Sequence, residues 1–123
     1  MTPDTAPHAA TEADPDAGER PWQVLAGIDP AATPFPAPSH IDDESIWVFR
    51  TKDGFRGVQE ACPHQRVMLG TAKLISNDTL IRCALHGFTF RLKDGVGINC
   101  RGATIRVFEI REEAGALLGR LAN

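Results

Sequence analysis

Four possible metal ligands occur as two short pairs, and they constrain the fold of this 123-residue chain more than any other feature. The first pair is Cys62 and His64, and the second pair is Cys83 and His86. Because at most two residues separate the members of a pair, a single loop can direct both side chains at one centre. The residues between the pairs, 65–82, are enough for a hairpin that brings the two loops together. The spacing therefore predicts a metal site built from two loops.

Thiolate and imidazole ligands together are typical of two kinds of centre. One is a tetrahedral Zn²⁺, but zinc modules usually pair Cys with Cys and His with His, whereas each loop here mixes the two. The other is a [2Fe-2S] cluster with two Cys on one iron and two His on the other. Two irons allow each loop to give one ligand to each metal ion, so the mixed pairs favour the cluster. A structural zinc-binding module is the alternative.

The motifs C-P-H at residues 62–64 and C-A-L-H-G at residues 83–87 resemble the Rieske family of iron–sulfur domains. The resemblance covers most of the chain after Pro21. It implies an all-β fold, a small antiparallel sandwich or barrel with a cluster-binding subdomain built from the two ligand loops. It also implies that a [2Fe-2S] cluster is the cofactor, and that four residues bind the cofactor and its metal ions: Cys62, His64, Cys83 and His86.

The cysteine content distinguishes branches of this family. Rieske subunits of respiratory complexes have a further Cys in each ligand loop, joined as a disulfide, and an N-terminal membrane anchor. Residues 65–67 and Leu85 hold the corresponding places here, and Cys100 is the remaining cysteine. The chain therefore looks like the ferredoxin branch. We expect Cys100 to be a small thiol in a loop, although its role is open.

The N-terminal segment differs in composition from the rest of the chain. Residues 1–20 have no large apolar residue after Met1, and their acidic residues are Asp4, Glu12, Asp14, Asp16 and Glu19. Such a segment cannot bury apolar surface, which predicts a disordered acidic tail. An acidic docking arm is the functional alternative. Residues 21–123 are expected to form a single Rieske domain, with the cluster-binding part at about 60–102.

Charge and hydropathy exclude several partners. The chain has 16 acidic and 13 basic residues, and the tail holds five of the former and one of the latter, so the remainder is nearly neutral. This balance does not favour a nucleic-acid surface. The sequence lacks a signal peptide and a long apolar run, so we expect a cytoplasmic protein that does not bind a membrane. We also expect a monomer.

Short apolar runs separated by turn residues predict antiparallel strands. The run Ile46–Phe49 predicts a central strand that is buried on both faces. Lys73–Ile75 and Thr79–Ile81 predict a hairpin between the ligand pairs. The alternation of apolar and polar residues over Phe88–Leu92 predicts a half-buried strand after the second ligand pair.

Three further segments have distinctive patterns. Ile28–His40 contains four prolines, which predicts an extended surface loop. The apolar residues between Ile105 and Ile110 change parity, which predicts a β-bulge near Val107. Val96–Gly102 is expected to be a third loop that, by resemblance to the family, covers the cluster from the side. It lacks the proline that is common in that loop.

The ligand set and its surroundings predict the class of reduction potential. Two imidazoles in place of two thiolates make the cluster less negative and easier to reduce, within a range of about −150 to +300 mV. The chain has no Tyr, and Phe88 stands where the respiratory branch has a Ser. Only the backbone N–H groups of Gln65, Arg66 and Gly87 are left as expected donors to the cluster. We therefore predict a low potential within this range.

The resemblance implies an electron carrier and not an enzyme. Such a carrier takes one electron from a flavin or iron–sulfur reductase and passes it to a terminal oxygenase, as the ferredoxin component of a Rieske non-haem iron oxygenase system does. The small subunit of an assimilatory nitrite reductase is the alternative within the family. A redox sensor is a further alternative from another class. The sequence names neither the terminal acceptor nor its substrate.

Overall fold

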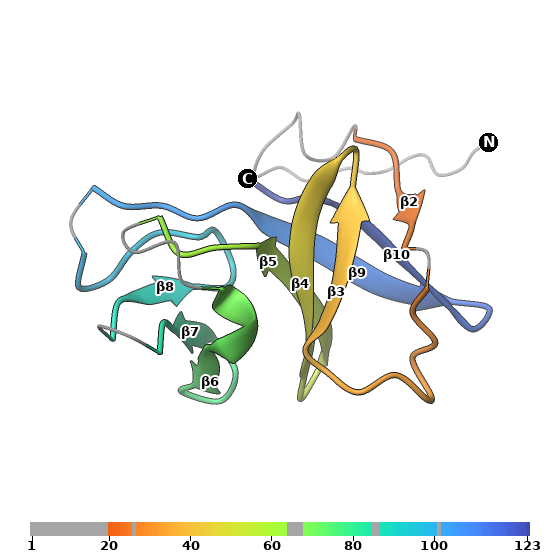
Figure 1. Ribbon diagram of the computed structural model, residues 1–123, viewed down its shortest axis with the longest axis horizontal. Helices are drawn as coiled ribbons and strands as arrows, with labels where there is room; N and C mark the ends of the chain where they lie inside the picture. The colour runs from red at the N-terminus through yellow and green to blue at the C-terminus, as the bar shows by residue number, and fades with distance from the viewer. Residues whose placement is uncertain (1–19, 26, 64–67, 85–86, 101) are drawn as a thin grey trace.

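Two antiparallel sheets make up the part of the chain that the computed structural model describes, residues 20–25, 27–63, 68–84, 87–100 and 102–123 (Figure 1). The larger sheet has six strands in the order β2-β10-β9-β5-β4-β3, and the smaller has three in the order β6-β7-β8. All neighbours pair antiparallel, which confirms the predicted all-β class.

The strands are short. Where two neighbouring strands of a sheet also follow one another in the sequence, a turn or a loop connects them. The strands of the large sheet are β2 (Gln23–Val24), β3 (Ala37–Ile41), β4 (Glu44–Thr51), β5 (Gly54–Gln59), β9 (Val107–Glu113) and β10 (Ala116–Leu121). The strands of the small sheet are β6 (Lys73–Ile75), β7 (Leu80–Arg82) and β8 (Thr89–Arg91). A single turn of 3₁₀ helix, η1 (Leu69–Thr71), precedes the small sheet.

The apolar side chains form two cores. The thiol core consists of Phe49, Val58, Cys62, Leu69, Ile81, Cys83, Phe90, Leu92, Cys100, Ile105 and Val107. The barrel core consists of Leu25, Ile28, Ala37, Ile41, Ile46, Val48, Phe108, Ile110 and Leu117. Strand β4 pairs with a strand on each side, and it gives Val48 to the barrel core and Phe49 to the thiol core. The prediction of a strand buried on both faces is confirmed.

The hairpin predicted between the ligand pairs is present as β6 and β7. Its turn residues, Ser76, Asn77 and Asp78, all have positive φ angles of 55–64°. Asn and Asp tolerate this left-handed conformation better than most residues, which explains why such residues occupy the turn. The Asp78 carboxylate also accepts a hydrogen bond from the backbone N–H of Lys52 at 2.8 Å, which joins the hairpin to the large sheet.

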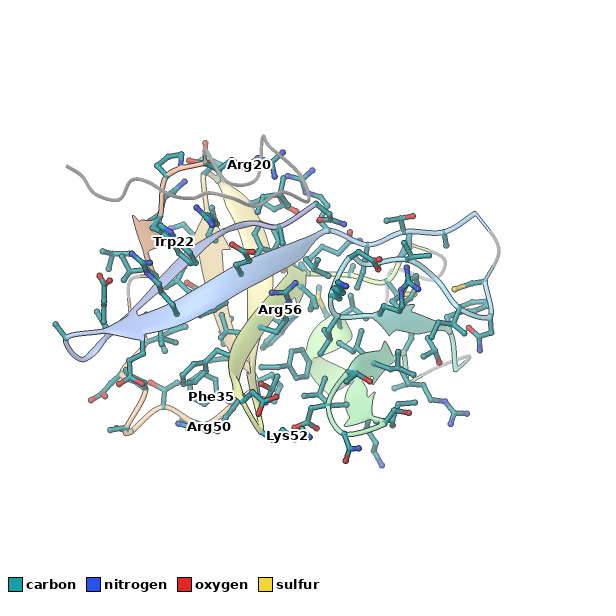
Figure 2. All side chains as sticks on the ribbon, turned by 180° about the vertical axis from the view of Figure 1, so that it is seen from behind. Arg20, Trp22, Phe35, Arg50, Lys52 and Arg56 are labelled. Atoms are coloured by element: carbon teal, nitrogen blue, oxygen red, sulfur yellow. The ribbon has the colours of Figure 1, made fainter. Side chains whose placement is uncertain are left out.

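A second link between the sheets comes from Arg56 on β5. Its guanidinium donates to the carbonyl groups of Leu92 and Lys93, both at 2.8 Å. Arg56 and Lys52 are both labelled in Figure 2, on neighbouring parts of the β4–β5 hairpin. Partial burial lowers the pKa of the Arg56 guanidinium, while the charges of Glu109 and Asp94 act in the opposite direction. The small sheet is thus held against the large one by a desolvated cation.

Two local predictions were wrong. Residues 37–40 are not loop but belong to strand β3, in which Pro38 pairs with Trp47. A proline is tolerated there because β3 is an edge strand and loses no ladder hydrogen bond on its open side. The predicted bulge near Val107 is absent, since β5 and β9 pair without interruption from Val58–Val107 to Phe55–Ile110. The change in parity has another cause: Val107 belongs to the thiol core and Phe108 to the barrel core.

Candidate metal centre

Two of the four predicted ligands are described by the structure, and both are buried in the thiol core. Cys62 is 1 % exposed and Cys83 is 2 % exposed. Cys62 follows the end of β5, and Cys83 follows the end of β7, so each thiol lies where a strand passes into a loop. None of the chain's three cysteines is in a disulfide. The other two predicted ligands, His64 and His86, lie outside the described residues.

The first ligand loop is anchored at both ends. Ala61 forms a β-bridge with Met68, and the Leu69 N–H donates to the Glu60 carbonyl at 2.8 Å. The Gln59 side chain adds a hydrogen bond to the Ala61 carbonyl at 2.7 Å. These contacts bring the two ends of the segment together on either side of residues 64–67, which are not described.

The second ligand loop is closed by two backbone hydrogen bonds. The Cys83 N–H donates to the Phe88 carbonyl at 2.7 Å, and the Gly87 N–H donates to the Cys83 carbonyl at 3.1 Å. Gly87 has a φ angle of +72°, a conformation that strongly favours glycine. In this structure the Cys83 carbonyl accepts the Gly87 N–H, and donation from Gly87 to the cluster stays a prediction. The same prediction for Gln65 and Arg66 falls outside the described residues.

A cation lies directly against this second loop. A β-carbon on Gly87 would be 3.1 Å from one terminal nitrogen of Arg82 and 3.2 Å from its Nε. The absence of a side chain at residue 87 therefore gives the Arg82 guanidinium space beside the loop. Arg82 precedes Cys83 and is exposed to solvent.

The third loop packs on the second ligand loop. The Ile98 N–H donates to the Thr89 carbonyl at 2.8 Å, and the Asn99 side chain makes two hydrogen bonds to the backbone of residues 87 and 89. Cys100 lies in this loop, as expected, and the structure adds that it is 5 % exposed and belongs to the thiol core. Sequence reasoning missed Asn99, since its partners are backbone groups that no side-chain motif reveals.

The surface near the first thiol is acidic. A recess of about 590 Å³ lies beside Cys62 and Pro63 and is lined by the acidic residues Asp43, Glu44 and Glu60. Arg106 also lines it and pairs with Glu44 at 2.8 Å. The first thiol thus lies below a mainly acidic surface, whereas the second lies beside Arg82.

The donor chemistry of this core fits an iron–sulfur cofactor. Two buried thiols at the mouths of two loops can supply the thiolate half of the ligand set, and buried thiolates need a metal cation to offset their charge. No group of three or more His, Cys, Asp or Glu side chains converges among the described residues, which exclude both predicted His ligands. The fold and the thiol pair define a small all-β domain with two buried thiols that could serve as metal ligands.

The comparison with protein families is specific. Residues 22–109 match the family model of the Rieske [2Fe-2S] domain. The chain belongs to this family, and the family's cofactor is a [2Fe-2S] cluster. A Rieske 2Fe-2S iron–sulfur protein of Mycobacterium tuberculosis is 36 % identical over 70 residues, which are 57 % of this chain but only 12 % of that protein.

Several solved structures share this fold. A protein described as a nitrite reductase NADPH small subunit has a TM-score of 0.69 and 18 % identity, over 82 % of this chain and 99 % of that chain. The ferredoxin of carbazole 1,9a-dioxygenase from Nocardioides aromaticivorans IC177 has a TM-score of 0.64 and 19 % identity, over 80 % and 95 %. A complex of reduced oxygenase and oxidized ferredoxin in carbazole 1,9a-dioxygenase has a TM-score of 0.55 and 21 % identity, over 66 % and 82 %.

Proposed function

We propose that this protein is a one-electron carrier with a low-potential Rieske cluster, and that Cys62, His64, Cys83 and His86 bind the cluster. The observation that carries the proposal is the placement of Cys62 and Cys83. They come from loops far apart in sequence, yet they share one apolar core and are almost completely buried. When bound, a [2Fe-2S] cluster supplies a reversible one-electron change.

The residues of the chain supply position and environment. The hydrogen bonds between Cys83, Gly87 and Phe88 hold the second ligand loop closed. The apolar side chains of the thiol core keep water from the two thiols. The chain has no Tyr, and Phe88 stands where a Ser hydroxyl could donate, which supports a potential near the bottom of the Rieske range.

As the physiological role we propose electron transfer from a flavin or iron–sulfur reductase to a terminal oxygenase. The fold similarity to oxygenase ferredoxins supports this role. The alternative is the small subunit of a nitrite reductase, which the fold similarity to such a subunit supports. In either role the chain transfers electrons and leaves catalysis to its partner.

We further propose that residues 21–123 form one Rieske domain, with the cluster-binding part at about 60–102, and that residues 1–20 are an acidic tail outside it. No helix in the described part of the chain could cross a membrane. We propose a monomer in the cytoplasm, with no role for nucleic acid.

A reductive titration tests the carrier function. The purified protein should accept one electron per chain and show the electron paramagnetic resonance (EPR) signal of a Rieske centre in the reduced state. A zinc module would accept no electron. The reduced protein should then be reoxidised by an oxygenase component with its substrate and O₂. Reoxidation only by nitrite with a nitrite reductase catalytic subunit would support the alternative and contradict the oxygenase role.

A further inference from the structure

Asn99 in the third loop connects that loop to the second ligand loop through both ends of its side-chain amide. Its Oδ1 accepts a hydrogen bond from the Thr89 N–H at 2.9 Å. Its Nδ2 donates to the Gly87 carbonyl at 3.0 Å. The partners determine the orientation of the amide, because a backbone N–H can only donate and a carbonyl can only accept. Rotating the amide by 180° would lose both bonds.

Thr89 lies at the centre of this contact. It is 8 % exposed and is the one buried polar residue in the described part of the chain. Its hydroxyl donates to the Gly87 carbonyl at 3.0 Å, so that carbonyl accepts from two side chains at once. The Thr89 carbonyl accepts from the Ile98 N–H at 2.8 Å, and the Cys100 thiol lies 3.8 Å from the same oxygen. Thr89 and Asn99 together therefore fix the Gly87 carbonyl.

The position of Gly87 makes this contact relevant to the metal centre. Gly87 directly follows the predicted ligand His86, and its N–H closes the loop onto the carbonyl of the other predicted ligand, Cys83. A glycine with φ of +72° has no β-carbon to limit its conformation. Hydrogen bonds to the peptide groups on either side of its Cα must therefore restrict the conformation of Gly87. Asn99 supplies one of these hydrogen bonds.

We propose that Asn99 is a positioning residue of the metal centre, which holds the second ligand loop in the conformation that presents Cys83 to iron. The inference rests on the proposed ligand set. Asn99 acts through Gly87 and Thr89, in a loop that lacks the proline often found there. The simpler interpretation is that Asn99 only stabilises the third loop. That interpretation predicts no effect on the electronic properties of the centre.

The main test variant is Asn99→Leu, which removes both hydrogen bonds and adds no charge. The matched control is Asn77→Leu in the β6–β7 turn. Leu is strained at the φ angle of 59° found there, so this control is also destabilised, but outside the three loops of the centre. Thr89→Val is a third variant, which removes the other donor to the Gly87 carbonyl at similar side-chain volume.

Three readouts are measured on the cluster-loaded protein: the reduction potential, the EPR spectrum of the reduced state, and hydrogen exchange of the Thr89 amide. We expect Asn99→Leu to shift the potential, to broaden or shift the EPR lines, and to speed exchange of the Thr89 amide about fivefold, the effect of one lost hydrogen bond. Thr89→Val should alter potential and spectrum in the same way, and Asn77→Leu should match the wild type in all three.

The proposal is overturned if Asn99→Leu keeps the wild-type potential and spectrum, whatever its stability, or if Asn77→Leu changes them equally. If Asn99→Leu holds too little cluster to measure, Asn99→Asp replaces it, because its carboxylate still accepts from Thr89 but repels the Gly87 carbonyl. An unchanged potential and spectrum in that variant would also overturn the proposal. A wild-type protein without a Rieske spectrum would instead refute the proposed function, so the two failures are distinguishable.

Discussion

A β-carbon on Gly70 would lie 2.5 Å from Cε2 of Trp47, closer than any stable contact between carbon atoms. Gly70 is in η1, directly after the first ligand loop, and Trp47 is on β4 of the large sheet. The Trp47 Nε1 is buried and has no hydrogen-bond partner among the described residues, so packing holds the ring in place. The missing side chain at residue 70 lets η1 lie directly on the indole ring.

We therefore expect Gly70→Ala to lower the free energy of unfolding by about 1–3 kcal/mol, the usual cost of overpacking. Because η1 follows the first ligand loop, the variant should also lose cluster faster when it is challenged with an iron chelator. Gly115→Ala is the control, since no atom lies within 4 Å of its β-carbon and only its φ of +82° is unfavourable. Equal cluster loss in both variants would contradict the role of the Trp47 contact. Urea unfolding and the decay of visible absorbance measure the two effects.

The three cysteines should respond differently to substitution. Cys62→Ser and Cys83→Ser are expected to abolish the Rieske-type visible and EPR spectra, because each removes a predicted ligand. Cys100→Ala should keep the spectra and cost about 1 kcal/mol of stability, since it removes one buried sulfur atom. Loss of the cluster in the Cys100 variant at normal folding would show that the ligand assignment is wrong.

Arg56 should be important for the attachment of the small sheet. Arg56→Met keeps much of the aliphatic side chain but leaves the Leu92 and Lys93 carbonyls without their donor. We expect a loss of about 2–3 kcal/mol in the free energy of unfolding, because charged hydrogen bonds contribute more than neutral ones. Arg56→Lys should recover only part of it, since an ammonium group lacks the planar fork that reaches two carbonyls. Wild-type stability in the Arg56→Lys variant would show that the positive charge alone accounts for the effect.

Stability should depend on pH through Asp94. Hydrogen bonds from Arg91, at 3.0 and 2.6 Å, hold the pKa of Asp94 below its usual value. A lowered folded-state pKa means that the stabilisation is fully present above the unfolded-state pKa of about 3.9 and is lost as pH falls through the lower folded-state value. The effect should be small, because the pair is partly exposed to solvent.

The measurement compares urea unfolding of the wild type and Asp94→Asn between pH 6 and pH 2.5. The wild type should be the more stable protein at pH 6, and the difference should shrink toward the acid end. A difference that stays constant over this range would mean that the Arg91–Asp94 pair does not contribute through its charge. Asp78→Asn is a useful control, because that carboxylate bonds a backbone N–H instead of a cation.

Candidate ligands are easier to propose from sequence than the residues that support their loops. Cys62 and Cys83 could be proposed as ligands from sequence because ligand spacing is a local property, and the structure places both thiols in the core. Asn99 could not, because it recognises backbone groups 10 and 12 residues away, which depend on how two loops pack. The prediction of a loop at Pro38 was wrong for a related reason. Proline excludes a central strand but not an edge strand, and only the pairing with Trp47 reveals which one is present.

The apparent bulge near Val107 shows the same limit. A change of parity in an apolar run indicates either an extra residue or a second buried face, and the sequence alone does not distinguish them. The uninterrupted register of β5 and β9 shows that the second buried face is the cause of the parity change. The pattern of Val107 and Phe108 is explained by the presence of two cores, one on each face of the strand.

The alternation of β9 side chains between the two cores has a consequence for how this protein unfolds. Val107 and Phe108 are adjacent in the chain, yet one packs around the thiols and the other inside the barrel. β4 joins the two cores in the same way through Phe49 and Val48. Because β4 and β9 each carry side chains of both cores, disrupting either strand disturbs both cores, so loss of the thiol core and unfolding of the barrel share their structural elements. Oxidative damage at the loops should therefore reach the whole domain and expose it to proteolysis as a unit.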